Sequence, residues 1–255
     1  MSKQTEQLHI ANSTWAMVEN AIRDGRRTKV ILPIGSLEQH GPHLPLSTDT
    51  IIAECVAEVV SEKCNTLLLP AIQIGCSMEH YGFRGTVSLQ IETLGHVIED
   101  IANSLVKSGL NKIFLINGHG GNKPIIDSTI AKLNDSLPEA HVYSFTVLDI
   151  AKLKFDEIRR SGRRLVGHAD ELETSLMLAI NPGLVDMTKA VTETPSLPDS
   201  LSFEREDLSK ISFGWSAKDV TRSGIIGDPK LASAASGKIL LNYITETIST
   251  IIRSL

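Results

Sequence analysis

Short apolar runs alternate with helical segments along this chain, and this alternation is the feature that most constrains its fold. Each run is too short for a helix and is followed by turn residues before a segment with helical periodicity begins. The predicted strands cover residues 30–34, 66–74, 112–116 and 142–148. A repeated strand–helix order predicts an α/β fold, in which a mostly parallel central sheet is covered by helices on both faces.

The predicted helices lie between and after these strands. They cover residues 50–63, 92–108, 122–133, 171–180 and 230–252. Asp49 or Thr48 is expected to cap the first helix, and Gly109 to close the second. Residues 191–224 are richer in Ser, Thr, Pro and charge, and we interpret them as a long excursion near a site or an interface. We therefore expect a single domain over residues 1–255.

Composition and charge exclude several classes of function. The net charge is −5 over 255 residues, and no run of Lys and Arg indicates binding to nucleic acid or to a membrane surface. The apolar runs are too short to span a bilayer, and the N-terminus lacks the pattern of a signal peptide. Three cysteines without a CxxC pair favour reduced thiols, so we expect a cytoplasmic protein.

The loop after the first predicted strand carries several candidate metal ligands. Glu38 and His40 are two residues apart, so an extended backbone places both side chains on one face. Asp49 follows at the start of the next helix, and prolines stiffen the path between them. Carboxylates and imidazoles are donors that divalent metals prefer. Taken alone, the same residues also fit an exposed Glu, a hydrogen-bonded His and a helix-capping Asp.

A glycine-rich segment, Asn117-Gly118-His119-Gly120-Gly121-Asn122, follows the third predicted strand. Glycines let the backbone turn tightly and approach a ligand, and a turn of this kind before a helix can also bind phosphate. The spacing matches neither the dinucleotide fingerprint nor the P-loop. His119 has little local side-chain packing, which suits a ligand, but the segment alone leaves a core histidine equally open.

His168 begins a third group of polar residues, which continues with Asp170, Glu171 and Glu173. If a helix starts near Asp170, Glu173 lies in its first turn, where the helix dipole stabilises a carboxylate that faces a cation. The same spacing fits a capping box, with Asp170 at the N-cap and Glu173 at N3. The two interpretations can coexist. Because all three groups lie near strand ends, together they favour a polynuclear metal site.

These motifs are similar to those of the creatininase family of metal-dependent amidohydrolases. The match runs in order across nearly the whole chain and rests on residues 35–46 with Thr48-Asp49, residues 117–122, His168-Ala169 with Glu171 and Glu173-Thr174-Ser175, and, more weakly, Gly224 with Gly227-Asp228-Pro229. The resemblance implies a three-layer α/β/α fold and a centre of two divalent metal ions, usually Zn²⁺ and sometimes Mn²⁺ or Fe²⁺. It also implies a homo-oligomer, often a hexamer, that acts on a small-molecule substrate.

The resemblance further implies which residues hold the metals. By position in the family motifs, Glu38, Asp49 and His119 would hold one ion. His40 and Asp49 would hold the other, so that Asp49 would bridge the two. His168 matches the catalytic histidine of the family.

Two glycines mark a departure from the family pattern. Creatinine-hydrolysing members have Tyr and Glu where this chain has Gly120 and Gly121, and that Glu is a metal ligand. We predict that Glu173 replaces it. We also name Glu171 as a candidate for orienting His168 or a substrate amine.

Further departures concern the substrate. Creatinine-hydrolysing members use tryptophans as a lid, but residues 163–165 include none, and Asp170 stands where the family usually has Gly. We predict hydrolysis of a carbon–nitrogen amide-type bond, with a formamide as the favoured substrate, as in a formamidopyrimidine deformylase. The alternatives are creatinine or another cyclic amide or ketone and, in a different class, a non-catalytic metal- or nucleotide-binding protein. Either substrate selection or a solvated loop fits the residues Met78, Glu79, His80, Tyr81 and Arg84.

Overall fold

The computed structural model describes residues 9–23, 28–162, 166–197 and 214–255. Its centre is a sheet of four parallel strands in the order β2-β1-β3-β4. The strands are β1 (Lys29–Ile34), β2 (Leu67–Leu68), β3 (Lys112–Asn117) and β4 (His141–Thr146). The register pairs Ile34 with Asn117, so β1 and β3 end side by side. The predicted parallel sheet is confirmed.

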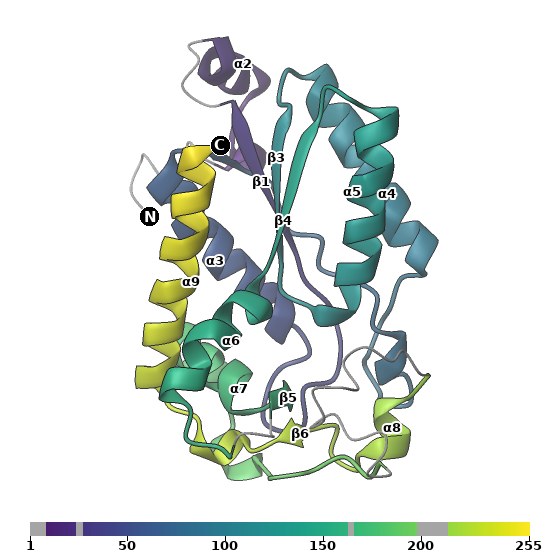
Figure 1. Ribbon diagram of the computed structural model, residues 1–255, viewed down its shortest axis with the longest axis vertical. Helices are drawn as coiled ribbons and strands as arrows, with labels where there is room; N and C mark the ends of the chain where they lie inside the picture. The colour runs from purple at the N-terminus through teal and green to yellow at the C-terminus, as the bar shows by residue number, and fades with distance from the viewer. Residues whose placement is uncertain (1–8, 24–27, 163–165, 198–213) are drawn as a thin grey trace.

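Successive residues of the strands face opposite sides of the sheet and fill two separate cores. Val30 and Leu32 pack on one side, and Ile31 and Phe114 pack on the other. The first core is covered by α4 (Ile91–Lys107) and α5 (Lys123–Ser136). The second is covered by α3 (Thr48–Cys64), α6 (Val147–Ile158), α7 (Glu171–Ile180) and α9 (Ala234–Ser254). Figure 1 shows the two groups on opposite sides of the sheet, which confirms the three-layer α/β/α fold.

Shorter elements complete the described part of the chain. They are α2 (Trp15–Arg23), α8 (Ala217–Val220), the strands β5 (Val166–His168) and β6 (Ile226–Gly227), and the 3₁₀ turns η1 (Ile10–Asn12), η2 (Met78–His80), η3 (Gly120–Asn122), η4 (Pro182–Leu184), η5 (Met187–Lys189) and η8 (Pro229–Leu231). Antiparallel pairing of β5 with β6 brings the C-terminal segment beside His168. Among the described helices, none is long and apolar enough to cross a bilayer. Residues 163–165 and part of the predicted excursion, 198–213, lie outside the described residues.

Several predicted boundaries need correction. Neither Thr48 nor Asp49 is the N-cap of α3, because the cap position is Ser47 and Asp49 lies in the first turn. The segment 66–74 forms only a two-residue strand, with one further bridge from Ile72 to Ile34. Residues 147–148 begin α6 instead of ending β4. By contrast, α7 begins and ends where the sequence predicts.

The strand order locates the place where a ligand would bind. The chain leaves β1 toward β2 on one side and leaves β3 toward β4 on the other, so the order reverses between β1 and β3. In open parallel sheets, ligands bind outside the carboxyl ends of the strands at such a reversal. The loop with Glu38 follows β1, and the loop with His119 follows β3. The topology therefore directs two of the three polar groups to the same crevice.

Candidate metal centre

The five predicted metal ligands form one buried group. Glu38 Oε1 and Asp49 Oδ2 each lie 3.2 Å from His119 Nδ1. On the other side of Asp49, its Oδ1 lies 3.2 Å from His40 Nε2, which is 3.9 Å from Glu173 Oε2. All five residues are 5% exposed or less. Three polar groups that are far apart in the sequence thus meet around Asp49.

Several atoms in this group are buried without a hydrogen-bond partner. Within the described part of the chain, they include Glu38 Oε1, His40 Nε2 and both carboxylate oxygens of Asp49. An uncompensated buried carboxylate is costly, so such atoms normally pair with a cation or coordinate a metal. Ligand atoms of Glu38, His40 and Asp49 all lie within 4.8 Å of one another. The residues present therefore fit a divalent metal.

Hydrogen bonds on the far sides of the ligands fix which atoms face inward. The Ser36 hydroxyl donates to Glu38 Oε2 at 2.9 Å, which leaves Oε1 free. His119 Nε2 donates to the Cys76 carbonyl at 2.9 Å, so Nδ1 is the ring nitrogen that faces the carboxylates. His40 Nδ1 lies 3.3 Å from the Glu38 carbonyl, which similarly leaves Nε2 facing inward. Outer hydrogen bonds of this kind orient the ligands of protein metal sites.

The electrostatics of the group show how closely opposite charges are packed. Burial alone would lower the pKa of His40, but the carboxylates of Asp49, Glu173 and Glu38 raise it to about 10. Burial opposes ionisation of Glu38 as well, yet His119, His80 and His40 hold its pKa well below the usual range. Without metal, the site therefore keeps a proton on an imidazole that a cation would displace.

The start of α7 reconciles the two interpretations of its acidic residues. Asp170 is the N-cap, and its carboxylate accepts from the backbone N–H groups of Leu172 at 2.9 Å and Glu173 at 3.3 Å. The Glu173 carboxylate accepts from Ala169 N at 2.5 Å with the same oxygen that approaches His40. Burial and the nearby Asp49 and Asp170 raise the pKa of Glu173 to about 8. Glu173 thus belongs both to the cap and to the polar group.

Glu171 lies elsewhere. Its carboxylate accepts hydrogen bonds from Arg160 N at 2.9 Å and Ser161 N at 2.7 Å, on the segment that follows α6. The side chain is fully buried there. Its position does not support the predicted role of Glu171 beside His168, because its oxygens satisfy backbone donors outside the crevice.

Gly121 has no room for the carboxylate that creatinine-hydrolysing members carry at this position. A Cβ on Gly121 would lie 2.4 Å from His119 Nε2 and 2.8 Å from Glu79 Oε1. A Cβ on Gly120, in contrast, would meet nothing within 4 Å. A side chain is therefore excluded at position 121 but could be accommodated at position 120.

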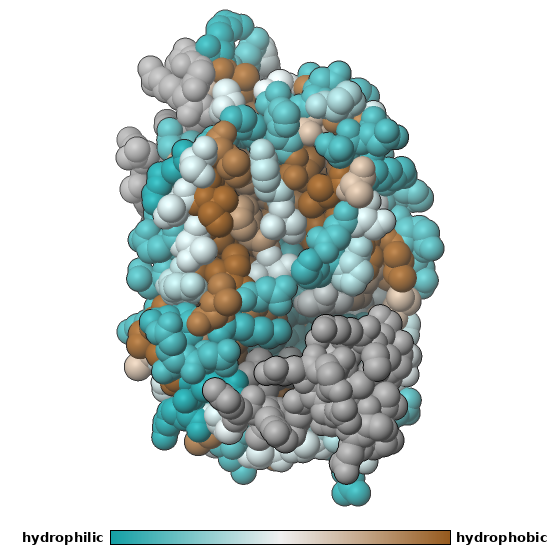
Figure 2. Space-filling view, viewed as in Figure 1, coloured by the Kyte–Doolittle hydropathy of each residue, from teal (hydrophilic) through white to brown (hydrophobic). Residues whose placement is uncertain are grey.

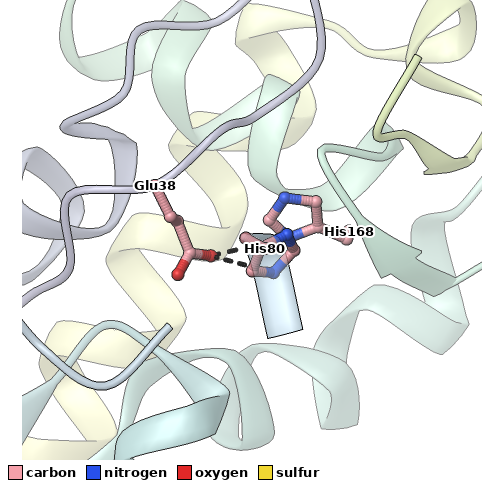
Figure 3. Close-up of side chains that lie close together, drawn as sticks. All are labelled: Glu38, His80 and His168. Carbon is pink, nitrogen blue, oxygen red and sulfur yellow. Dashed lines mark ion pairs between the residues drawn. The ribbon is translucent and has the colours of Figure 1, made fainter. Parts of the chain in front are cut away.

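Two further histidines lie against the ligands. The His168 ring is 4.3 Å from the His40 ring and 4.3 Å from the His80 ring, centroid to centroid. Figure 3 shows His80 and His168 beside Glu38, whose Oε1 is 3.4 Å from His80 Nε2 and 3.8 Å from His168 Nδ1. Burial lowers the pKa of His80 to about 4 and that of His168 well below its usual value. Both rings are therefore neutral near pH 7.

His80 is the site residue that sequence reasoning placed least well. The sequence shows it only as one polar residue on a loop after the second predicted strand, where a solvated position is equally plausible. In the structure it is 3% exposed, on the turn η2. Its position after a strand of the parallel sheet was the available signal, because that edge carries the other ligands.

Comparisons with known proteins define the class. The family model "Creatininase: Creatinine amidohydrolase" matches residues 11–252, so the chain belongs to the creatininase family and is an amidohydrolase of that family. It is 27% identical to a creatinine amidohydrolase of Pseudomonas putida over 98% of this chain and 97% of the relative. It is 34% identical to a mycofactocin precursor peptide peptidase of Mycolicibacterium smegmatis over 82% of this chain and 78% of that protein.

A third relative and two solved structures extend the comparison. The chain is 27% identical to a formylaminopyrimidinone-phosphate deformylase of Methanococcus maripaludis over 84% of this chain and 88% of the relative. A manganese form of creatininase superposes with a TM-score of 0.82, at 27% identity over 97% of this chain and 98% of the other. A creatininase variant described as Zn–Zn type gives 0.81 at 26% identity over 97% of each. Related creatininases thus carry Mn or Zn.

Proposed function

We propose that this enzyme hydrolyses an amide-type carbon–nitrogen bond in a small molecule, with a formamide as the favoured substrate and two divalent metal ions, preferably Zn²⁺, in each subunit. The observation that carries the proposal is the set of buried ligand atoms without hydrogen-bond partners around Asp49. Mn²⁺ or Fe²⁺ would suit the same nitrogen and oxygen donors.

The two oxygens of Asp49 divide the ligands into two sets. Glu38, His119 and Asp49 Oδ2 would hold one ion, since all three meet on one side of the aspartate. His40, Glu173 and Asp49 Oδ1 would hold the other. This division supports Glu173 as the replacement for the carboxylate that position 121 cannot carry.

The chemistry follows from the centre and the neutral histidine above it. When bound, a pair of divalent ions activates water near neutral pH and polarises the carbonyl of the substrate. His168 Nε2 donates to the Gln39 carbonyl at 2.7 Å, so Nδ1 carries a lone pair that faces the centre. His168 can therefore accept a proton at Nδ1 and deliver it to the leaving nitrogen.

Substrate class is inferred from the glycine at position 120 and from the relatives. Gly120 stands where creatinine-hydrolysing members carry an aromatic residue, and its absence supports a substrate other than the small ring of creatinine. The relatives include a deformylase, named for a formylamino substrate, and a peptidase, named for a peptide substrate, which support a formamide or similar amide. Creatinine or another cyclic amide or ketone is the alternative within the family.

A non-catalytic metal- or nucleotide-binding protein is the alternative from another class. Such a protein would need the metal ligands but not His168. The buried position of His168 against His40 favours the enzyme.

The test combines metal analysis with a substrate screen. Mass spectrometry of the purified protein should find about two equivalents of metal per chain, and formamides, lactams and creatinine should be compared on the metal-loaded protein. Glu38→Gln should abolish turnover of the best substrate. Full turnover by metal-loaded Glu38→Gln, or a wild-type protein that takes up no metal, would contradict the proposal.

The proposal also covers assembly and location. Leu153, Ile239 and Ile251 are exposed and apolar on α6 and α9, and Figure 2 shows hydrophobic residues gathered on this face. Such a surface supports a homo-oligomer, a hexamer by family resemblance, which analytical ultracentrifugation would measure. The free thiols of Cys55, Cys64 and Cys76 support a cytoplasmic location.

A further inference from the structure

Gln39 stands between the ligands Glu38 and His40 and makes an unusual set of hydrogen bonds. Its side-chain Oε1 accepts from Gly41 N at 2.9 Å. Its Nε2 donates to the Gly224 carbonyl at 3.0 Å and lies 2.8 Å from His80 Nδ1. The residue is 5% exposed. A polar side chain so deeply buried and fully paired holds its neighbours in defined orientations.

The orientation of the Gln39 amide follows from its two backbone partners. Reversing the amide would set its NH₂ against the Gly41 N–H and its oxygen against the Gly224 carbonyl. Gly224 contributes directly, because its φ is +86° and a Cβ there would lie 1.8 Å from Gln39 Oε1. The amide therefore presents a donor, not an acceptor, to His80.

This orientation fixes the tautomer of His80. Since the Gln39 NH₂ donates, His80 Nδ1 must accept, and the neutral ring then carries its hydrogen on Nε2. That Nε2 points at the metal ligands, 3.4 Å from Glu38 Oε1 (Figure 3). A ring nitrogen that carries hydrogen has no lone pair for a metal.

The backbone of Gln39 fixes the second histidine in the opposite sense. The Gln39 carbonyl accepts from His168 Nε2, so the inward-facing Nδ1 of His168 is an acceptor. One residue thus sets two neighbouring rings, with centroids 4.3 Å apart, as a donor and an acceptor.

The pairing distinguishes between roles that distances leave open. Ligand atoms of Glu38, His80 and His168 lie close enough to hold a metal ion. The hydrogen on His80 Nε2 argues against that use. We propose that His80 is a catalytic residue whose Nε2–H binds an acceptor oxygen of the substrate, and that Gln39 is the positioning residue that sets the tautomers of His80 and His168. The proposal rests on the proposed function, because the Nε2–H of His80 is available to a substrate only if Glu38 Oε1 binds a metal ion and does not accept this hydrogen.

Metal content tests His80 separately from the centre itself. Zn²⁺ uptake is measured for wild type, for His80→Ala and for His96→Ala, a matched control on the exposed side of α4. About two equivalents are expected in all three. Loss of one equivalent in His80→Ala alone would make His80 a ligand and overturn the inference. Uptake of none by wild type would instead defeat the proposed function.

The tautomers can be observed by NMR of the zinc-loaded protein with ¹⁵N-labelled histidine. In wild type, His80 should show a protonated Nε2 and an unprotonated Nδ1, assigned by loss of its signals in His80→Gln. Gln39→Met removes the amide at similar size, so the His80 tautomer should become mixed while His168, held by the backbone, stays unchanged. Gln39→Glu, which places an acceptor at Nδ1, should move the hydrogen of His80 to Nδ1. A wild-type His80 protonated on Nδ1 would overturn the inference.

Kinetics on the substrate identified by the screen complete the test. Removing one hydrogen-bond donor to a developing oxyanion lowers kcat by about 10²- to 10³-fold, so His80→Leu should lose that much with little change in KM. His80→Gln keeps an N–H donor near the same position and should recover part of the loss. Equal kcat in wild type and in zinc-loaded His80→Leu would contradict the catalytic role.

Discussion

The loop after β1 and the start of α7 both bury carboxylates, but they treat them in opposite ways. In this loop and the first turn of α3 that follows it, Glu38 Oε1 and both oxygens of Asp49 have no hydrogen-bond partner within the described chain. At α7, Asp170 and Glu171 accept hydrogen bonds from backbone N–H groups. In the first arrangement the carboxylates face imidazoles that a metal ion could replace, whereas in the second the backbone itself satisfies the carboxylates.

Glu173 lies at the border between these two regions. It accepts one backbone hydrogen bond from Ala169 and also approaches His40. The contrast teaches that burial of a carboxylate does not identify a metal ligand. The unpaired oxygens of Glu38 and Asp49 support them as metal ligands most strongly, whereas Glu173 is supported by its approach to His40 despite its backbone hydrogen bond.

Replacing Asp49 should have the largest effect. Asp49→Asn removes the charge that both proposed ions share, and metal ions contribute several kcal/mol to catalysis, so kcat should fall by about 10³-fold or more. Zinc content should drop below one equivalent, as measured by mass spectrometry. Two retained equivalents of zinc would show that Asp49 does not bridge two ions and that its unpaired oxygens do not indicate metal binding.

Replacing the neighbouring carboxylates Glu171 and Glu173 should separate stability from metal binding. Glu171→Gln leaves a buried backbone donor poorly paired, so the free energy of unfolding should fall by about 1–3 kcal/mol with zinc content unchanged. Glu173→Gln is the matched comparison and should weaken the second zinc ion. Denaturant unfolding and zinc titration on both variants check this. Zinc loss in Glu171→Gln, without loss of stability, would make Glu171 a metal ligand and contradict its structural role.

The pH dependence of zinc binding should give the smallest effect. The pKa of His40 is raised to about 10 in the metal-free protein, so at pH 7 its imidazole is protonated and must release a proton when Nε2 binds zinc. Zinc affinity should therefore rise with pH, by about tenfold per unit for each proton released. Isothermal titration at pH 6, 7 and 8 would measure it, and an affinity independent of pH would exclude His40 as a ligand.

Much of the fold could be predicted from local sequence. The strands β1 and β3 coincide with short apolar runs, and α7 lies between an Asp N-cap and the stop Asn181-Pro182-Gly183. All three elements are therefore predictable from local sequence. The prediction is wrong at the junction of β4 and α6. Apolar residues continue from the strand into the helix, so the sequence predicts a strand to residue 148 and does not predict α6.

The sequence by itself determined the types and order of the candidate ligands and the parallel sheet that would gather them at one edge. Only the tertiary structure decided which side chains face the crevice. Glu171 and Glu173 are both buried in the first turn of α7. The Glu171 carboxylate accepts hydrogen bonds from the backbone N–H groups of Arg160 and Ser161, whereas the Glu173 carboxylate lies beside His40. His80 likewise depends on Gln39 and, through it, on Gly224. Those partners lie up to 185 residues apart in the chain, so no local pattern could reveal the pairing.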